Sequence, residues 1–504
     1  MAILPIILIC SFTLWTILED RKGAGVMQTV FMLSFLGWVA TVLLNKGMST
    51  GFPTLAISFL ALSIYGFLIQ KVFKYTSMRI LLGALAISPF IYWQSNPLEL
   101  SIDKNLITSE LQIDKAYELI VKCKHSKVAD VEKQLKTLPL VEGISSWNVM
   151  DAEATELDDY LLVNIKNGKC DYPLITKIEG INGVKWIEQN ETWSIEEQTA
   201  KEDIATSTTA NSVNDPRARN QWSFNNLSMD QYHNILQNSG IKPIKPVKLF
   251  MVDSGVNFQH EDLKGAVISH KSANQQRNET DANGHGTHCA GIAAAVTNNK
   301  LGIASFNPGN DFVSVGSVGV LNRFGLATQS AIISGLIEAA DAGADVINMS
   351  FGGRSQQLKE EAYNDAFAYL KRKNIILVAA AGNSAADASQ YLPTGRDDVI
   401  SVSATDRSNG KAQFSNYVQN TGMGIAAPGT SILSTYKSSY ASLDGTSMAA
   451  PHVTGLLAIL RAIRPDLTTE EAFKILNSTG TTTKDGKATG KLINPAEALK
   501  AVMD

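Results

Sequence analysis

The chain has 504 residues, which is longer than one ordinary domain, so two or three folded units are expected. Its 44 basic and 48 acidic residues leave a net charge of -4, which provides no basic surface and excludes a nucleic-acid partner. The four cysteines are scattered without C-x-x-C spacing, which excludes a zinc ribbon and a disulfide-dense scaffold.

The first hundred residues are unusually apolar. Hydrophobic segments cover residues 2–18, 26–44, 52–69 and 80–93, with charged residues only at their borders. Their lengths approach the roughly 20 residues of a membrane-spanning helix. A cleaved signal peptide is an alternative for the first segment, but Glu19 and Asp20 stand where a cleavage site should be. Buried helices of a soluble protein are a second alternative. Residues 1–95 predict four transmembrane helices in a lipid bilayer.

Basic residues predict how these helices are oriented. They gather in the first and third connections, at Arg21, Lys22, Lys71, Lys74 and Arg79, against Lys46 alone in the second. Because positive loops favour the cytoplasm, the amino terminus and everything after Trp93 should lie outside it. The pattern predicts a multi-pass protein of the cell (inner) membrane whose larger part is extracytoplasmic.

Residues 112–195 have the pattern of a small α+β domain. Apolar periodicity predicts, in order, strand, helix, strand, strand, helix, strand at residues 117–122, 128–138, 144–149, 160–165, 172–181 and 184–187. This order predicts a split βαβ, ferredoxin-like fold; a generic α+β linker domain is the alternative. Cys123 and Cys170 end two strands that could be adjacent, so they form a candidate disulfide.

Residues 196–213 are poor in large apolar residues and rich in Thr, Ser, Ala and charge, which indicates an exposed linker. A processing cut would fall here. A second soluble domain is expected from residue 214 to residue 504.

Asp253 ends an apolar run and is followed by Ser254 and Gly255. A carboxylate at the end of a buried strand is well placed to hold an imidazole. Taken alone, the segment is better explained by an aspartate in a turn at a strand end.

The second motif, residues 283–291, surrounds His285 with glycines and small residues suited to a tightly packed helix. A histidine can act as a general base near neutral pH. Zinc binding by His285 and His288 is the alternative, although H-E-x-x-H spacing and a third ligand are missing. His288 is therefore interpreted as structural and Cys289 as a buried thiol.

Ser447 lies among small residues in the third motif, at the expected start of a helix. The free N–H groups of a helix start can stabilise a developing oxyanion. A lone G-T-S would be an ordinary N-cap. The three motifs together, in the order Asp, His, Ser, are far more specific than any one of them.

Segments VDSGVNFQHEDL, GHGTHCAG, INMSFGG, VAAAGN and GTSMAAPHVTG resemble those of the subtilisin-like serine proteases, the subtilase family of peptidase S8 type. The resemblance covers residues 214–504 and includes an NDP…QW opening at residues 214–222. It implies an α/β fold, a three-layer α/β/α domain with a mostly parallel sheet. By the resemblance, Asp253 orients His285, and His285 takes the proton of the nucleophile Ser447. Asn383 is the oxyanion-hole amide, and no cofactor is required for the chemistry.

The same resemblance implies that residues 112–195 are an inhibitor I9-like propeptide, which assists folding and inhibits its own catalytic domain. The protein would then be a zymogen. If the linker is cut the protease leaves the membrane, and if it is not the protease stays tethered.

The resemblance also implies substrate-binding positions. The two walls of the P1 pocket correspond to Ser350, Phe351 and Gly352, and to Ala380, Ala381 and Gly382. Residues 318–325 should include the edge strand that pairs with an extended peptide. Tyr391 falls near the pocket floor, where its ring would restrict large P1 side chains.

The resemblance also implies a structural calcium ion, because residues 297–303 resemble a loop that binds calcium in relatives. Its matching positions are Asp262, Thr297, Asn299, Leu301 and Ile303. Oxygen ligands of this kind suit a hard cation. An ordinary surface loop without metal is the alternative.

The sequence therefore predicts a membrane-anchored serine endopeptidase that acts on proteins or peptides. The alternative is a membrane sensor or receptor whose protease-like domain mainly binds peptide. The intact triad and oxyanion positions argue against binding alone.

Overall fold

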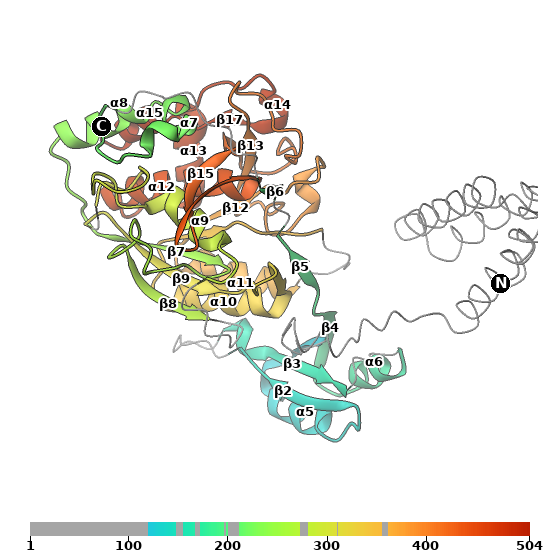
Figure 1. The fold of residues 1–504 in the computed structure, drawn as a ribbon. Helices are drawn as coiled ribbons and strands as arrows, with labels where there is room; N and C mark the ends of the chain where they lie inside the picture. Colours follow the sequence, from blue (N-terminus) through green and yellow to red (C-terminus); the bar gives the residue numbers. More distant parts are fainter. Residues whose placement is uncertain are drawn as a thin grey trace, which may run out of the picture. The chain divides into compact units, whose positions relative to one another are not determined.

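The computed structural model describes residues 119–147, 155–166, 172–195, 198–199, 211–272, 281–309, 311–354 and 361–503 (Figure 1). The four hydrophobic segments, Cys170 and most of the linker lie outside these residues. The chain divides into Met1–Glu110 and Leu111–Asp504, and the account below concerns the second unit. In the described part, the one helix long and apolar enough to cross a membrane is Thr446–Ile463, which is almost entirely buried inside the fold.

Residues 119–189 form a four-stranded antiparallel sheet with two helices. The elements are β1 (Leu119–Cys123), α5 (Val128–Leu135), β2 (Val141–Ser145), β3 (Tyr160–Ile165), α6 (Tyr172–Glu179) and β4 (Val184–Gln189). The sheet order is β2-β3-β1-β4. Each helix buries an apolar stripe, Val131 and Leu135 on α5 and Leu174 and Ile178 on α6. The observed order of strands and helices is the one that the sequence predicts.

Cys123 is a buried free thiol, so the candidate pairing with Cys170 is not formed here. Burial raises the pKa of the Cys123 thiol to about 12. The side chain therefore acts as a small apolar group of the core.

The larger domain is built on an eight-stranded sheet in which every neighbouring pair is parallel. In spatial order the strands are β17 (Lys491–Leu492), β14 (Gly424–Pro428), β13 (Ile400–Thr405), β12 (Ile376–Ala380), β11 (Val346–Met349), β7 (Val247–Asp253), β9 (Val313–Gly319) and β8 (Val267–Ser272). Parallel sheets need apolar residues on both faces because helices cover both. The α/β fold with a parallel sheet is thus observed.

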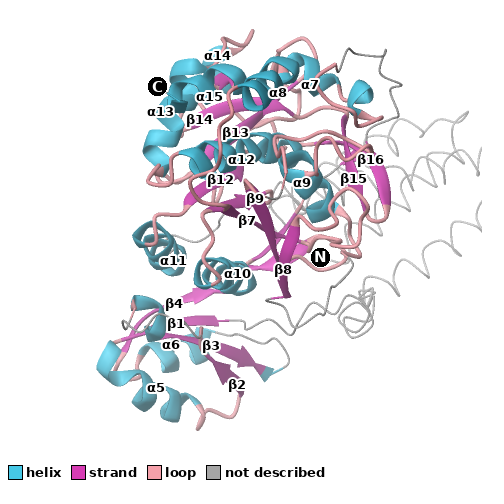
Figure 2. Cartoon of the chain, turned by 90° about the vertical axis from the view of Figure 1, so that its left-hand side faces the viewer, coloured by secondary structure: helices cyan, strands magenta, loops and turns pink. Residues whose placement is uncertain are grey.

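Helices form a layer on each face of this sheet (Figure 2). On β7, Leu249 and Met251 pack in the cluster that includes α9 (His285–Ala294) and α12 (Thr446–Ile463). Phe250 and Val252 alternate with them and pack toward α10 (Gln329–Asp341) and α11 (Glu361–Arg372). The alternation follows from the two-residue period of a strand.

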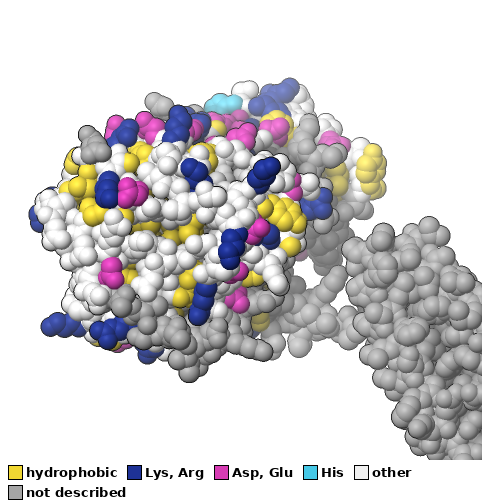
Figure 3. All heavy atoms as spheres, turned by 90° about the horizontal axis from the view of Figure 1, so that it is seen from above, with side chains coloured by type: hydrophobic (Ala, Val, Ile, Leu, Met, Phe, Trp, Pro, Cys, Tyr) yellow, Lys and Arg dark blue, Asp and Glu magenta, His cyan; other side chains and the backbone are white. Residues whose placement is uncertain are grey.

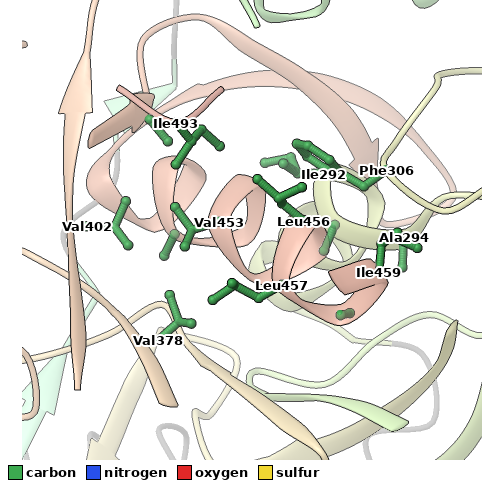
Figure 4. Close-up of a cluster of buried hydrophobic side chains, with 14 of the residues drawn as sticks. Ile292, Ala294, Phe306, Val378, Val402, Val453, Leu456, Leu457, Ile459 and Ile493 are labelled. Atoms are coloured by element: carbon green, nitrogen blue, oxygen red, sulfur yellow. The ribbon is translucent and has the colours of Figure 1, made fainter. Parts of the chain in front are cut away.

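Helix α12 is the central helix of the layer that also contains α9. Val453, Leu456 and Leu457 project from it among residues of the sheet and of α9 (Figure 4). Its buried length explains its apolar composition, because a helix that is hydrophobic all round belongs in a core. This packing fixes the start of α12, where Ser447 lies.

Further helices and strands belong to the two domains. They are η1 (His125–Lys127), η2 (Glu156–Asp159), η4 (Ala218–Asn220), η5 (Ala388–Gln390), α7 (Trp222–Asn226), α8 (Met229–Asn238), α13 (Thr469–Thr479), α14 (Gly486–Thr489), α15 (Pro495–Met503), β15 (Ile432–Tyr436) and β16 (Ser439–Asp444). Acidic and basic side chains are mixed across the face seen in Figure 3, in keeping with the small net charge.

Charged and aromatic contacts join the small domain to the larger one. Lys122 of β1 is 2% exposed, and its Nζ lies 2.9 Å from Asp365 Oδ2 on α11. The hydroxyl of Tyr160 donates to the same oxygen at 2.7 Å. Glu188 of β4 accepts from the backbone N–H of Ala362 in the first turn of α11 at 3.1 Å. A carboxylate is favourable there because the helix N-terminus presents free N–H groups.

Candidate active site

The three sequence motifs meet at the carboxyl end of the parallel sheet. Asp253 is the last residue of β7, His285 the first residue of α9, and Ser447 lies in the first turn of α12. Ligand sites of open parallel sheets occur at this edge, because the connections to the helices diverge there. All three side chains are buried, with Ser447 4% exposed.

Asp253 and His285 form a buried hydrogen-bonded pair. His285 Nδ1 lies 2.6 Å from Asp253 Oδ1, and the backbone N–H of Ser254 donates to the same oxygen at 2.6 Å. This contact assigns the Nδ1 proton to the bond with Asp253 and makes Nε2 the basic nitrogen. Burial lowers the pKa of His285 below its ordinary value, and the charge of His288 adds to this effect. The imidazole is therefore neutral, the form that can accept a proton.

Glycines allow these groups to approach. Gly284 has φ +99°, a left-handed conformation that glycine adopts without steric cost. A side-chain carbon on Gly286 would collide with the carbonyl oxygen of Gly255 and lie 3.0 Å from Asp253 Cβ. The glycines around His285 in the motif are thus required by the packing of α9 against the end of β7.

Ser447 is held by contacts from two neighbouring elements. Its hydroxyl donates to the carbonyl oxygen of Ser350 at 2.9 Å. Its own carbonyl oxygen accepts from Ser350 Oγ at 2.9 Å and from Cys289 Sγ at 3.3 Å. A hydroxyl has one proton, so this bond to Ser350 must be exchanged before Ser447 can give its proton to His285.

Asn383 lies beside the start of α12 with its amide orientation fixed. Its Oδ1 accepts from the backbone N–H and the Oγ1 of Thr446, both at 2.9 Å. A Cβ atom built on Gly445 would lie 3.5 Å from the donor atom Asn383 Nδ2 and 3.6 Å from the backbone nitrogen of Ser447. Two donors therefore converge on one small region, which suits a developing negative charge.

A cleft runs across this site, and it contains most of the predicted substrate-binding residues. Ser350, Phe351, Gly352, Ala380, Gly382 and Tyr391 line it together with Asn383 and Ser447. Ala381 does not; it is fully buried and packs with Ala388 and Val418 beneath the wall. Successive residues of the segment that follows β12 point to opposite sides, so the middle residue of Ala380-Ala381-Gly382 faces away.

The predicted edge strand is shifted in the structure. Val318 and Gly319 belong to β9, which lies between β7 and β8 in the large sheet, and the strand that pairs outside that sheet is β10 (Leu326–Thr328). The backbone turns at Asn322, whose side chain accepts from the N–H groups of Phe324 and Leu326. The predicted range 318–325 therefore reaches the pairing segment at Gly325, and the pairing continues through β10.

The segment that follows the small domain, residues 192–195, lines the cleft. Strand β5 (Thr192–Ser194) pairs antiparallel with β10, and the Ile195 N–H donates to the Gly325 carbonyl oxygen at 2.9 Å. Strand β6 (Gln198–Thr199) pairs with Leu443 and Asp444 of β16, just before Ser447.

Trp193 anchors this segment. It is 7% exposed, and its ring stacks on Tyr363 of α11 with centroids 5.3 Å apart and an interplanar angle of 4°. A side-chain carbon on Gly353 would come within 2.9 Å of the indole, so the absence of a side chain makes room for it. The role of Trp193 was not predicted, since a lone aromatic before a linker gives no local signal.

The zinc alternative is not supported. The Nε2 of His288 lies 3.0 Å from the Ala441 carbonyl oxygen, while His285 faces Asp253. Burial lowers the pKa of His288 to about 4, in agreement with a neutral structural histidine. Cys289 is buried, and burial raises the pKa of its thiol well above the ordinary value, so it is an inert thiol.

The loop with calcium-like composition brings acidic groups together. Asp262 is fully buried and accepts from Asn299 Nδ2 and from the Ile303 N–H, each at 2.8 Å. The loop also holds Asp215, a residue that the prediction missed, which accepts from the N–H groups of Asn298 and Asn299. Burial and then the charge of Asp262 raise the pKa of Asp215.

Two buried carboxylates with neutral donors fit a hard divalent cation, which would neutralise their repulsion. The Thr297 side chain donates to the Ser305 carbonyl oxygen, so only backbone oxygens of Thr297 and Leu301 would be ligands. The sequence signal that could have indicated Asp215 was its place after Asn214 in the NDP…QW opening of the domain.

Comparisons with known proteins agree with this fold and site. The family described as "Subtilase family" matches residues 245–492. Thermitase of Thermoactinomyces vulgaris is 40% identical over 250 residues, 49% of this chain and 84% of that protein. Subtilisin DY of Bacillus licheniformis is 41% identical over 264 residues, 50% of this chain and 91% of that protein. A solved structure of a protease from Pseudoalteromonas arctica is similar with a TM-score of 0.50 and 27% identity, covering 58% of this chain and 99% of that one.

The fold and the site define a serine hydrolase with a parallel α/β sheet. The chain belongs to the subtilase family, and it is a subtilisin-like serine endopeptidase. Enzymes of this family need no cofactor for their chemistry.

Proposed function

We propose that this chain is a membrane-anchored serine endopeptidase in which Ser447 attacks the substrate, His285 is the general base and Asp253 orients His285. The observation that carries the assignment is the buried contact of 2.6 Å between His285 Nδ1 and Asp253, beside Ser447 at the start of α12. Asp253 fixes the imidazole tautomer, so Nε2 is the nitrogen that would accept the Ser447 proton.

Hydrolysis would follow in two steps. Ser447 Oγ attacks the scissile carbonyl carbon while its proton passes to His285 Nε2, and the carbonyl oxygen becomes an oxyanion. Asn383 Nδ2 and the Ser447 N–H donate to that oxyanion. The intermediate then collapses, the amine leaves with the proton from His285, and the acyl group stays on Ser447. Water, deprotonated by His285, releases the acid and restores the hydroxyl.

The cleft supports binding of an extended peptide. Strand β10 offers an edge for backbone pairing, and the segment around Trp193 pairs with it as a substrate would. Ser350, Phe351, Gly352, Ala380 and Gly382 would bind the P1 side chain. Tyr391 on the same wall favours small P1 residues, so a preference for Phe or Tyr at P1 would contradict its role.

We further propose that residues 112–195 are an inhibitor I9-like, ferredoxin-like prodomain. The antiparallel sheet order β2-β3-β1-β4 supports the fold, and the passage of β5 through the cleft supports inhibition. Self-processing would cut the chain within the predicted linker, residues 196–213. The catalytic domain would then begin near residue 214, as the sequence predicts.

The membrane part of the proposal rests on the sequence. The four hydrophobic segments support a multi-pass anchor in the cell membrane, and the basic connections support an extracytoplasmic protease. The carboxylates of Asp262 and Asp215 also support a structural calcium ion. Its ligands would be the side chains of Asp262, Asn299 and Asp215 and the backbone oxygens of Thr297, Leu301 and Ile303.

The decisive experiment compares the full-length chain with Ser447→Ala. Casein hydrolysis, fragment mass and membrane association would be recorded for both. A catalytic fragment near 30 kDa that appears only in the wild type, a size of about 290 residues and one domain, would support self-processing and release. An active, uncut wild type would mean a tethered enzyme. Equal hydrolysis by both chains would overturn the assignment of Ser447.

A further inference from the structure

Asp281 is a fully buried carboxylate that the proposed mechanism does not use. It lies four residues before His285, with φ 49°, in the left-handed region that aspartate seldom adopts. Its Oδ1 accepts from Ser254 Oγ at 2.8 Å and from the Gly284 N–H at 2.9 Å. Its Oδ2 accepts from the Thr287 N–H at 2.8 Å and from Thr287 Oγ1 at 2.6 Å.

These four bonds join two separate elements. Ser254 follows Asp253 directly at the end of β7, whereas Gly284 and Thr287 enclose the first turn of α9. Ser254 Oγ also accepts from the Gly286 N–H at 3.0 Å, while it donates its own proton to Asp281. One side chain therefore determines how the residue after Asp253 sits against the turn that carries His285.

Asp281 also places a second negative charge beside the dyad. All four of its partners are donors, which only an ionised carboxylate accommodates without a mismatch. Its charge raises the pKa of Asp253, although burial has the larger effect. The other titratable groups facing this region are His288 and Cys289 on α9 and Tyr436 on β15, and the Lys437 side chain lies near Gly284.

We propose that Asp281 is a positioning residue that holds Asp253 and His285 in register and supports the imidazolium formed during the reaction. This role rests on the proposed catalytic function. It differs from that of a plain helix cap, because a cap contributes to stability alone, whereas a group that acts through the dyad also changes kcat and its pH dependence.

The test compares full-length chains carrying Asp281→Asn, Ser254→Ala and both changes. After processing, kcat and KM for a fluorogenic peptide would be measured across pH, per active site titrated with a fluorophosphonate. Asp281→Asn should lower kcat about 10- to 100-fold with KM unchanged, since small misplacement of reacting groups costs this much. The acid limb of kcat should move to lower pH, because a negative charge that favours the imidazolium is lost.

Ser254→Ala provides the second arm should Asp281→Asn fail to fold or to process. It removes the link to β7 and the acceptor of the Gly286 N–H, while the bonds of Asp281 to Gly284 and Thr287 and its charge remain, so kcat should fall with the acid limb in place. If the two residues act as one unit, the double variant should lose no more than Asp281→Asn alone. An unchanged kcat in Ser254→Ala would overturn the proposal.

Asp345→Asn is the matched control. Asp345 is also a buried aspartate, and it accepts from the Lys248 N–H at 2.9 Å, but Lys248 lies about 16 Å along β7 from Asp253. This variant should lose stability and keep the wild-type kcat and pH profile. If Asp281→Asn behaves like Asp345→Asn, Asp281 is only a cap. If instead Ser447→Ala hydrolyses peptide like the wild type, the proposed function itself fails.

Discussion

Trp193 offers the sharpest test of how the prodomain blocks the cleft. Its indole is almost completely buried and stacks on Tyr363. A tryptophan buries about 150–250 Å², which at about 25 cal/mol per Å² corresponds to about 4–6 kcal/mol. The entropy cost of ordering residues 192–195 offsets part of this free energy. Truncation of an aromatic anchor ordinarily costs about 2–4 kcal/mol of binding free energy. Trp193→Ala should therefore shift the equilibrium between closed and open cleft roughly 30- to 700-fold toward open.

The assay is labelling of Ser447 by a fluorophosphonate in the uncut full-length chain, which a gel separates from processed fragments. A closed cleft excludes the probe, so the labelling rate reports the open fraction. Thr192→Ala is the control, because Thr192 belongs to the same strand but its side chain is exposed. If uncut Trp193→Ala labels no faster than uncut wild type, Trp193 does not anchor the tail and the reasoning fails.

Three further predictions follow from other parts of the site. Asn383→Ala should lower kcat about 100- to 1,000-fold with little change in KM, a magnitude taken from subtilisin rather than derived from this structure; a drop confined to KM would contradict its position beside the oxyanion. Burial lowers the pKa of His452 to about 4, whereas its value in the unfolded chain is about 6.5. The unfolded state therefore binds a proton on His452 more tightly, so the folded state loses stability as the pH falls from about 6.5 to about 4. The free energy of unfolding would be measured by denaturant against pH in an inactive Ser447→Ala background. There, His452→Gln should reduce the slope of this free energy against pH by about 1.4 kcal/mol per pH unit. An unchanged slope would show that His452 is not buried. EDTA should lower the thermal midpoint by about 5–10 °C if calcium is present near 100 times its Kd, and Asp262→Asn should abolish the effect; an unchanged midpoint in the parent chain would remove the calcium proposal.

Local patterns predicted the secondary structure well. Residues 160–165 were expected as a strand and form β3 with those bounds, because their apolar residues and their turn signals are both local. The helix expected at 128–138 ends at Leu135, three residues early, as Thr137 and Leu138 close turns instead. Helix ends depend on such competing hydrogen bonds, which periodicity does not register.

Sequence alone determined the chemistry of this protein, because the types of group that can do it lie in short motifs. A carboxylate after a strand, a histidine among glycines and a serine at a helix start are each recognisable within ten residues. The resemblance of these motifs to one family supplied their order and the fold, and the parallel sheet agrees with it.

Tertiary structure alone decided which groups meet. Asp253 and His285 are 32 residues apart in sequence, and Ser254 joins Asp281 only because β7 ends where α9 begins. The burial of Ala381, the pairing of β10 with β5 and the stacking of Trp193 on Tyr363 likewise arise from contacts between distant segments. Periodicity tells which face of an element is buried, but not what lies against it, since that depends on how all the layers pack together.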